Sequence, residues 1–424
     1  MKLTDQESRL LNGEEGEIKA LAMSYLVKLG NAFDGKEMVD IAYAHMSSGS
    51  ALREGEIEYL EELADKGATV VVPTSSEVIP VDLRDPESIH APAPIVEEHR
   101  RLLDIQRRMG IASTYTCVPF TQGYVPAKGT YIASMESAAI IYFNSVLGAK
   151  TNRCGYFVLY AALTGKYPKI GYLLEQNRKG THLVSLETKL SGSTDYGALG
   201  YHVGALVGSG VPVFEGIDQP RQEELMVLGA ALATSGTVAM YHVVGVTPEA
   251  RTTGEAFGGT RPQGKIVVSE REIREVYRKL HTAKDSHVDF VFLGCPQYTV
   301  EQIRVAAGLL DGRRVHENIT LWIGTNRMAF AMAERMGYDD IIKKAGGVLV
   351  CDTCPMLSFL RLDSLAKRGI SGPVFKTMLT DSPKQAKYAN HTMGCEIILD
   401  KVDACIEAAV KGKWEGSNDR TGDD

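Results

Sequence analysis

Four cysteines of this chain lie where a thiol could do chemistry. Cys117 and Cys295 stand alone, and Cys351 and Cys354 form the pair in CDTC (351–354). Proline follows Cys117 after one residue and follows Cys295 and Cys354 directly. Because proline lacks an N–H and fixes φ, it ends a strand and leaves the preceding thiolate free to point into a cleft. A single cysteine at a strand end is usually a small buried hydrophobic residue, so the informative observation is that the position recurs.

The spacing of these cysteines fits some kinds of site better than others. Structural zinc normally uses close pairs with a nearby histidine or second pair, and only one pair is close here. No helix opens at the first cysteine of CDTC, unlike a thioredoxin-type redox pair. Buried thiols and an iron–sulfur cluster held by dispersed cysteines remain. A cluster with three protein ligands would leave one iron open to hold a substrate hydroxyl while a base removes a proton beside a carboxylate, which is a dehydration.

Three segments offer donors to an anionic substrate. GAKTNR (148–153) and GTNR (324–327) each present threonine, asparagine and arginine after a glycine, and their amide and guanidinium groups suit a carboxylate or phosphate. An ordinary helix start explains each of them equally well. From the first segment we take Asn152 and Arg153 as candidate catalytic residues. The third segment, TDSPKQAKY (380–388), gives a strand-to-helix turn, an anion-binding geometry, and the candidates Thr380, Ser382 and Lys384.

Further candidates for substrate contact lie in AHMSSGS (44–50), PTSSE (73–77) and SMESAA (134–139). The first two are hydroxyl-rich loops that suit an oxyanion, although such sequences are more often simple turns. We expect His202 and His242, which lie in apolar surroundings, to be hydrogen-bonded core residues. The candidates from these segments are Ser48, Gly49, Ser50, Ser76, Glu77, Glu136 and Ser137.

Helices and strands must bring these residues together. Apolar residues at helical spacing predict a helix within 15–33, a second helix that stops at Gly67, and a third that ends at Gly110. Strands are predicted over 68–73 and over 113–116, and the latter would deliver Cys117.

The C-terminal part alternates strands and helices most clearly. Strands are predicted at VDFVFLGCP (288–296), ITLWIGT (319–325), GGVLVCDTC (346–354) and GPVFKTML (372–379), with helices after the first, second and fourth. This alternation indicates a parallel, doubly wound sheet, in which ligands bind beyond the carboxyl ends of the strands. The residues at those ends are Cys295, Thr325, Cys351, Cys354 and Thr380.

Composition limits the class of protein. The chain has 424 residues, 44% hydrophobic and 23% charged, enough for two or three packed cores. We expect an N-terminal α/β domain (1–126), a central glycine-rich α/β domain (127–265), a C-terminal doubly wound domain (266–414) and a disordered tail (415–424). A net charge of −7 without a dense basic cluster argues against nucleic acid, and the absence of a long apolar run or signal pattern indicates a cytoplasmic protein with no membrane contact.

Several motifs together carry a family resemblance. They are TCVPF (116–120), SMESAAIIYFNSVLGAKTNR (134–153), EQNRKG (175–180), DYGALGYHVG (195–204), SGTVAMYHVVGVTPE (235–249), GCP (294–296), VCDTC (350–354) and TDSPKQAKY (380–388). In this order, and across most of the chain, they resemble the large subunit or catalytic domain of the aconitase X family. The resemblance implies aconitase-like parallel, doubly wound α/β sheets with helices on both faces.

The same resemblance implies an iron-dependent hydro-lyase. Its metal would be an iron–sulfur cluster (4Fe-4S or 2Fe-2S) or a mononuclear iron held by Cys117, Cys295 and Cys354, with Cys351 a neighbour and Cys154 not expected as a ligand. The expected substrate is a small β-hydroxy carboxylate, either cis-3-hydroxy-L-proline or (R)-mevalonate 5-phosphate. We favour the first slightly, since Glu77 could meet a ring nitrogen, whereas a phosphate would need an anchor such as Lys384.

Family members also need a small swivelling domain that supplies a serine base. This chain ends at Asp424, soon after the expected helix in KVDACIEAAVKG (401–412), so we expect that domain to be absent and to come from a separate small subunit in a heterodimer. The chain departs from the family in PTSSE, where Ser76 stands in place of an expected asparagine. A non-catalytic iron–sulfur binding protein or sensor is the alternative function.

Overall fold

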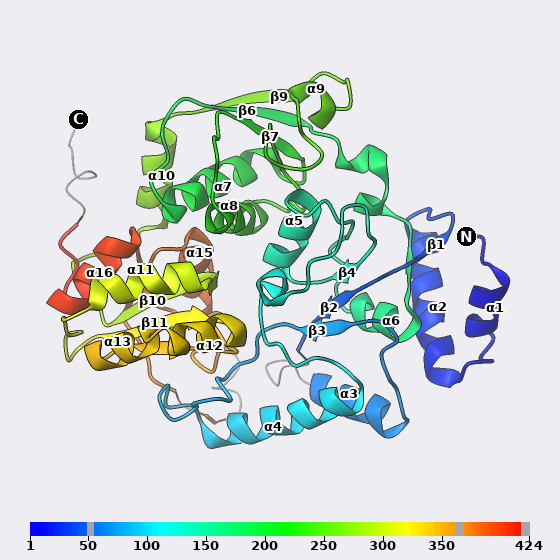
Figure 1. Ribbon diagram of the computed structural model, residues 1–424, viewed down its shortest axis with the longest axis horizontal. Coiled ribbons are helices and arrows are strands. Elements are labelled where there is room, and N and C mark those ends of the chain that lie inside the picture. Colours follow the sequence, from blue (N-terminus) through cyan, green and yellow to red (C-terminus); the bar gives the residue numbers. More distant parts are fainter. Residues whose placement is uncertain (49–54, 362–368, 371, 417–424) are drawn as a thin grey trace.

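Three α/β units make up the molecule (Figure 1). The computed structural model describes residues 1–48, 55–361, 369–370 and 372–416. Each unit is built around a parallel sheet, of three, four and five strands in chain order. The five-stranded unit lies on one side of the view and the N-terminal helices α1 and α2 lie on the other (Figure 1).

The first unit centres on strand β2. β2 (Ala44–Met46) pairs in parallel with β3 (Thr74–Ser76) on one side and β4 (Ala133–Ser134) on the other. A separate antiparallel pair joins β1 (Met38–Asp40) to β5 (Lys166–Pro168). The helices of this unit are α1 (Asp5–Leu11), α2 (Glu17–Ala32), α3 (Glu56–Asp65), α4 (Ala93–Arg108), α5 (Ser137–Ser145) and α6 (Phe157–Thr164), with short 3-10 turns η1 (Pro119–Gln122), η2 (Gly171–Leu173) and η3 (Glu175–Arg178).

The three helices predicted here are confirmed as α2, α3 and α4, but the two strands are wrong. Residues 68–73 form no strand, and the hydroxyl-rich Thr74–Ser76 pairs instead, because it lies in register with β2. Residues 113–116 run beside β3 without forming a strand. A single bridge joins Ser75 to Ala112, and the Thr116 N–H donates to the Ser76 carbonyl. β-Branched composition alone therefore does not locate a strand when the partner strand decides the register.

The second unit has the strand order β8-β7-β6-β9, all parallel. Its long helices α7 and α8 pack closely, and a Cβ on Gly200 would lie 2.4 Å from the Leu228 carbonyl oxygen, which accounts for glycine in this stretch. The bounds are β6 (His182–Leu186), α7 (Ser193–Val207), β7 (Pro212–Glu215), α8 (Gln222–Ser235), β8 (His242–Val243), α9 (Thr253–Ala256), β9 (Gly264–Val268) and α10 (Glu270–Leu280).

The third unit is a parallel sheet of order β12-β11-β10-β13-β14. Its bounds are β10 (Phe290–Tyr298), α11 (Val300–Leu310), β11 (Thr320–Thr325), α12 (Arg327–Arg335), α13 (Tyr338–Ala345), β12 (Val348–Val350), β13 (Thr377–Thr380), α15 (Pro383–Thr392), β14 (Glu396–Leu399) and α16 (Val402–Lys411). In Figure 1 α11, α12 and α13 lie over β10 and β11.

Alternate residues of these strands serve two different cores. Phe290 and Phe292 of β10 belong to the large core shared with the first two units, whereas Val291 and Leu293 belong to a separate core with α11, α12, α13 and α16. Parallel strands buried on both faces, in an open sheet with this strand order, are typical of a doubly wound fold. The predicted fold class is therefore confirmed.

Sheet pairing groups the chain differently from the predicted boundaries at 126 and 265. β4 was placed in the central domain, yet it pairs with β2 of the first unit, and β9 at Gly264–Val268 completes the second sheet. The predicted tail begins at 415, and residues 417–424 lie outside the described ranges. No helix within those ranges combines the length and apolarity needed to cross a bilayer.

Candidate active site

Three of the four cysteines meet where the first and third units join. Cys295 lies in β10 just beyond Leu293, the last residue before the ladder with β11 shifts register. The strand continues to Tyr298 past a cis Cys295–Pro296 peptide, so proline does not end it as predicted. Cys117 lies in the turn before η1, and the Gln297 N–H donates to its Sγ at 3.5 Å. Cys354 follows β12 after a tight turn.

The thiols of Cys117, Cys295 and Cys354 share one electrostatic environment. Burial raises the pKa of Cys295 to about 11 and that of Cys354 to about 12, and the pKa of Cys117 is raised as well. The charge of Cys295 raises the pKa of both other thiols, so Cys295 interacts electrostatically with each of them. Lys384 lowers the pKa of all three and so opposes the effect of burial. A cation at this position favours the thiolates that a metal needs.

The donor set consists of three thiols, the ligand type that iron–sulfur clusters take. Within the described residues, no three His, Cys, Asp or Glu side chains surround one point closely enough to hold a metal ion together. A cluster spreads its thiolate ligands over two or more irons, so the sulfurs can lie farther apart than the ligands of one ion. All seven cysteines are free, and of the seven only Cys117 is partly exposed.

The CDTC turn is held by a buried network of charges. Asp352 has a positive φ of 62°, and its carboxylate pairs with Arg327 of the GTNR segment. Its carbonyl accepts from the Ile79 N–H at 2.8 Å, and Asp82 accepts from the Cys351 N–H at 2.8 Å. Burial raises the pKa of Asp352, and Arg327 offsets part of that increase. Arg327 is therefore a structural partner of the turn, which presents Cys354 to the site.

Cys351 and Cys354 lie in different cores. Cys351 packs with the helices of the third unit, whereas Cys354 packs in the large core with Cys295. Burial raises the pKa of Cys351, and the charged groups that act on it next are Asp82 and Asp352. Cys154 bonds to the carbonyl of Asn152 at 3.4 Å and interacts with Tyr167. Neither Cys351 nor Cys154 has one of the three candidate thiols among the groups that shift its pKa.

Glu136 and Lys384 form a buried ion pair beside the thiols. Glu136 caps α5 through the Ala139 N–H at 2.7 Å, and the Lys384 Nζ donates to its Oε1 at 2.9 Å. Both side chains are about 95% buried, with exposed fractions of 5% and 6%. Burial alone would raise the pKa of Glu136, but Lys384 brings it below its ordinary value. The Lys384 Nζ also donates to the Ser137 hydroxyl at 3.2 Å, which brings three predicted residues together.

The remaining predicted substrate contacts divide between the site and the scaffold. Ser382 caps α15 and its hydroxyl lowers the pKa of Cys295, and Glu77 raises the pKa of Cys354, so both lie at the site. Ser76, Ser48 and Thr380 are buried, and their side chains bond to the Ala112 carbonyl, the Val78 carbonyl and the Ser382 N–H, which are scaffold contacts. Gly49 and Ser50 lie outside the described residues.

The side chains of Asn152 and Arg153 are bonded to backbone groups. The Asn152 amide donates to the Ile170 carbonyl at 3.0 Å and accepts from the Tyr172 N–H at 2.8 Å. Arg153 donates to the Ala233 and Val238 carbonyls at 3.3 and 3.1 Å. Their catalytic role stays a prediction, and these bonds favour a role for Asn152 in holding the loop around Tyr172 and for Arg153 in holding the end of α8. His242 is buried and bonded to the Arg178 carbonyl, as expected for a core histidine, whereas His202 is only partly buried.

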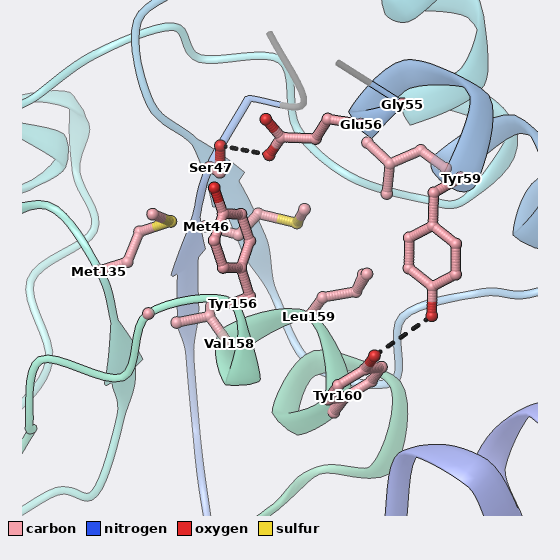
Figure 2. Close-up of a pocket in the computed structure, with 12 residues that line it drawn as sticks. Met46, Ser47, Gly55, Glu56, Tyr59, Met135, Tyr156, Val158, Leu159 and Tyr160 are labelled. Carbon is pink, nitrogen blue, oxygen red and sulfur yellow. Dashed lines mark hydrogen bonds between the residues drawn. The ribbon is translucent and has the colours of Figure 1, made fainter. Parts of the chain in front are cut away.

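An apolar pocket of about 350 Å³ adjoins this region without including the cysteines. Figure 2 shows Met46, Met135, Tyr156 and Leu159 around it, with Ser47 bonded to Glu56. Because side chains alternate along a strand, Met46 points to the face of β2 opposite His45. The pocket therefore lies on the face of this sheet opposite the His45 side chain. Its lining residue Met135 directly precedes Glu136 in sequence.

Three residues of the site were not anticipated: Gln297, Asp352 and His45. Gln297 holds Cys117 through its N–H and accepts from the Thr116 hydroxyl at 2.6 Å, and its place two residues after Cys295 is the signal that could have suggested it. Asp352 lies inside CDTC, where the cysteines drew attention. His45 lies on β2 in register with Ser134 of β4, and its only signal is the sequence AHM before the serines.

Comparisons with known proteins agree along the whole chain. Three family models match in order: the aconitase X first domain at residues 1–176, the second domain at 180–278 and the third domain at 288–411. A solved structure of aconitase X from Thermococcus kodakaraensis, in its holo-form, aligns with a TM-score of 0.85 and 32% identity over 96% of this chain and 100% of that one.

Curated relatives include two kinds of enzyme that align over most of this chain. The phosphomevalonate dehydratase large subunit of Methanothermobacter thermautotrophicus is 37% identical over 93% of this chain and 95% of its own length. The cis-3-hydroxy-L-proline dehydratase of Pseudomonas aeruginosa is 34% identical over 96% of this chain and 70% of its own length. Both names describe dehydratases.

Proposed function

The chain belongs to the aconitase X family and is a hydro-lyase, and on this premise we propose that it removes water from a small β-hydroxy carboxylate. The candidate substrates are cis-3-hydroxy-L-proline and (R)-mevalonate 5-phosphate, after the two groups of relatives. The observation that carries the proposal is the buried group formed by Cys117, Cys295, Cys354 and the Glu136–Lys384 pair, which unites an iron-type donor set with charged residues.

We propose that Cys117, Cys295 and Cys354 hold an iron–sulfur cluster. When bound, such a cluster supplies a Lewis acid for the departing hydroxyl. Lys384 favours the thiolate forms of all three ligands. Glu136 balances that cation, and burial of the pair excludes water from the region. Cys351 packs in the other core and is not a ligand in this proposal.

The pairing of Lys384 with Glu136 favours the imino acid substrate. A phosphate needs a cation that is free to bind it, and Lys384 is buried and already paired. Glu77 is partly exposed and acts on Cys354, which supports a role for its carboxylate in meeting the ring nitrogen of cis-3-hydroxy-L-proline. We therefore propose this substrate first, and (R)-mevalonate 5-phosphate second.

We also propose a small swivelling subunit as the partner that supplies a serine base. Support comes from the relatives named as large subunits and from the longer cis-3-hydroxy-L-proline dehydratases, of which this chain spans 70%. Residues at the carboxyl ends of β10 and β13 would face that partner, since ligands of doubly wound sheets bind there.

The test is anaerobic reconstitution of the full chain with iron and sulfide, with and without the small-subunit protein, followed by assay of both substrates. Cys354→Ala should lose the cluster absorption and the activity, whereas the matched variant Cys351→Ala should keep both. Chelation of the iron should abolish turnover. Turnover of neither substrate despite a full cluster would favour the sensor alternative, and loss of the cluster in Cys351→Ala alone would refute the ligand assignment.

A further inference from the structure

A second cavity, of about 240 Å³, lies where the second and third units meet. It is lined by Tyr298, the last residue of β10, and by Asp381, which directly follows β13. Because β11 and β13 flank β10 on opposite sides, the chain leaves β10 in two directions at this point. Such a switch point is where open parallel sheets bind ligands. The described residues that line the cavity include no cysteine, and neither Glu136 nor Lys384 is among them.

The alternation of side chains along β10 separates this cavity from the thiols. Gln297 faces the first unit, where its N–H donates to Cys117 and its side chain accepts from the Thr116 hydroxyl. Tyr298, the next residue, points to the other face and packs in the core with α11 and α16. Cys295 belongs to the large core instead. The cavity therefore lies on the side of the strand end that faces away from Cys117.

Four helices begin at this cavity, α7, α8, α11 and α16, and two of them begin without a capping side chain. α7 follows Gly192, which has no side chain, and α16 follows Lys401, whose ammonium group cannot accept a hydrogen bond. The first-turn N–H groups of both helices, at Ser193 and Val402, therefore point outward without an acceptor from the cap residue. The dipoles of all four helices add partial positive charge. This arrangement suits a carboxylate.

Asp381 brings a buried negative charge to the same cavity. Its exposed fraction is 7%, and its Oδ2 accepts from the Tyr298 hydroxyl. Within the described part of the chain, no hydrogen bond of ordinary geometry reaches its Oδ1. Burial raises the pKa of Asp381 to about 6, and the Tyr298 hydroxyl and nearby backbone N–H groups lower it only in part. A buried carboxylate oxygen without a donor favours a ligand that brings one, above all a cationic N–H.

The other charged side chains around the cavity have ordinary structural roles. Arg221 and Lys401 pair with carboxylates at 2.9 and 3.3 Å and add positive charge near the helix ends. The remaining acidic side chains lie in first helical turns, where a negative charge stabilises a helix: Glu223, Glu301 and Asp403. Asp381 lies in no helix, so its charge is left for a ligand.

We propose that this cavity binds a small zwitterion, an α-amino or imino acid, with its ammonium group on Asp381 and its carboxylate at the N-termini of α7 and α16. An anion alone would meet the charge of Asp381, and a cation alone would meet the helix ends. The volume equals that of about eight waters at about 30 Å³ each, so it has room for a molecule of about eight non-hydrogen atoms. L-proline has this size. The inference concerns a site other than that of the proposed function.

Three ligands with the same ring size separate the two charges. They are L-proline, pyrrolidine, which lacks the carboxylate, and cyclopentanecarboxylate, which lacks the nitrogen. Isothermal titration calorimetry of the full metal-free chain at neutral pH gives the Kd of each. We expect L-proline to bind at least about tenfold more tightly than either of the others, because each charge-assisted hydrogen bond contributes about that much. Absence of L-proline binding, or equal affinity for either of the other two ligands, would refute the proposal.

Asp381→Asn tests the ammonium end. Asparagine keeps an acceptor for the Tyr298 hydroxyl and removes the charge, so L-proline should bind about tenfold more weakly or worse. Asp339→Asn is the matched control, because Asp339 is equally buried, has one paired and one unbonded oxygen, and lies on α13 outside the cavity. It should bind L-proline as the wild type does. Wild-type affinity in Asp381→Asn would place L-proline elsewhere and refute the proposal, as would an equal loss in Asp339→Asn.

Ser193→Pro tests the carboxylate end. Proline is tolerated at the first position of a helix and removes only the N–H there, whereas Ser193→Ala keeps that N–H and removes the hydroxyl. L-proline should bind several-fold more weakly to Ser193→Pro than to Ser193→Ala, and equal affinities would refute the proposal. These titrations need neither iron nor turnover. Failure of the dehydratase assay would therefore count against the proposed function alone, and failure of the titrations against this cavity alone.

Discussion

Breaking the Glu136–Lys384 pair should cost more stability than removing it. Lys384→Met leaves the Glu136 carboxylate buried without its cation, and Glu136→Gln leaves the ammonium without its anion. Both side chains are about 95% buried, so solvent screens the pair little. Loss of one partner from such a pair typically costs about 3–5 kcal/mol. Each single variant should therefore lose about that much free energy of unfolding.

The double variant Glu136→Gln/Lys384→Met should recover most of the loss. Its glutamine oxygen can still accept the Ala139 N–H that caps α5, and no charge remains buried at this point. Because the double variant should lose less than either single variant, the coupling energy of the cycle should exceed about 3 kcal/mol, which is the usual upper end for residues in direct contact.

Urea unfolding of the metal-free variants at neutral pH measures this cycle. The two tryptophans, Trp322 and Trp414, both lie in the third unit, so fluorescence follows the unit that carries Lys384. Single variants within about 1 kcal/mol of wild type, or strictly additive losses in the double variant, would refute the view that these charges depend on each other.

Three further predictions concern the scaffold. Glu272 completes the capping box of α10, and hydrogen bonds from the Ser269 side chain and backbone lower its pKa to about 2. Glu272→Gln should therefore lose stability above the ordinary pKa near 4.5, and the difference from wild type should vanish as the pH falls toward 2. Unfolding curves across pH test this, and a pH-independent difference would contradict it. Gly294→Ala should unfold the third unit, because its Cβ would lie 2.3 Å from the Gly324 carbonyl oxygen at a φ of +112°. The matched variant Gly308→Ala in α11 meets no atom and should raise the free energy of unfolding by up to about 1 kcal/mol. Equal melting temperatures for the two variants would be inconsistent with this geometry. Asp352→Ala should release Arg327 and the CDTC turn and lower cluster retention, while Asp340→Ala on α13 should not, as iron content after reconstitution would show.

Much of the third unit was predictable because its strands are buried on both faces. Apolar runs such as those around Phe290 and Leu321 predict fully buried strands, and helices with clear caps separate them. The first unit was harder, because its strands are three residues or shorter and β3 is made of Thr74, Ser75 and Ser76. Strands of that kind are chosen by hydrogen bonds to a partner, which a local pattern does not contain.

The candidate site, too, was predictable from the sequence only in part. Cysteines and Lys384 stand out by type and by their place after a strand, so sequence reasoning could single them out. Asn152 and Arg153 stand out equally, yet both donate to backbone carbonyls of other segments. Residue type shows which groups are able to bind an anion, and only the tertiary structure shows which of them are already bonded.

The CDTC pair illustrates why spacing alone misleads at such a place. Cys351 continues the alternation of β12 and enters the core under α11 and α13, on the side away from Cys295. The positive φ of Asp352 then turns the chain, and Cys354 enters the large core on the other side of the sheet. Two cysteines three residues apart are thus separated by the sheet itself, whereas Cys295 and Cys354, 59 residues apart in sequence, act on each other. The topology of the parallel sheet therefore assembles the three thiols, and the tight turn at Asp352 selects which member of the pair joins them.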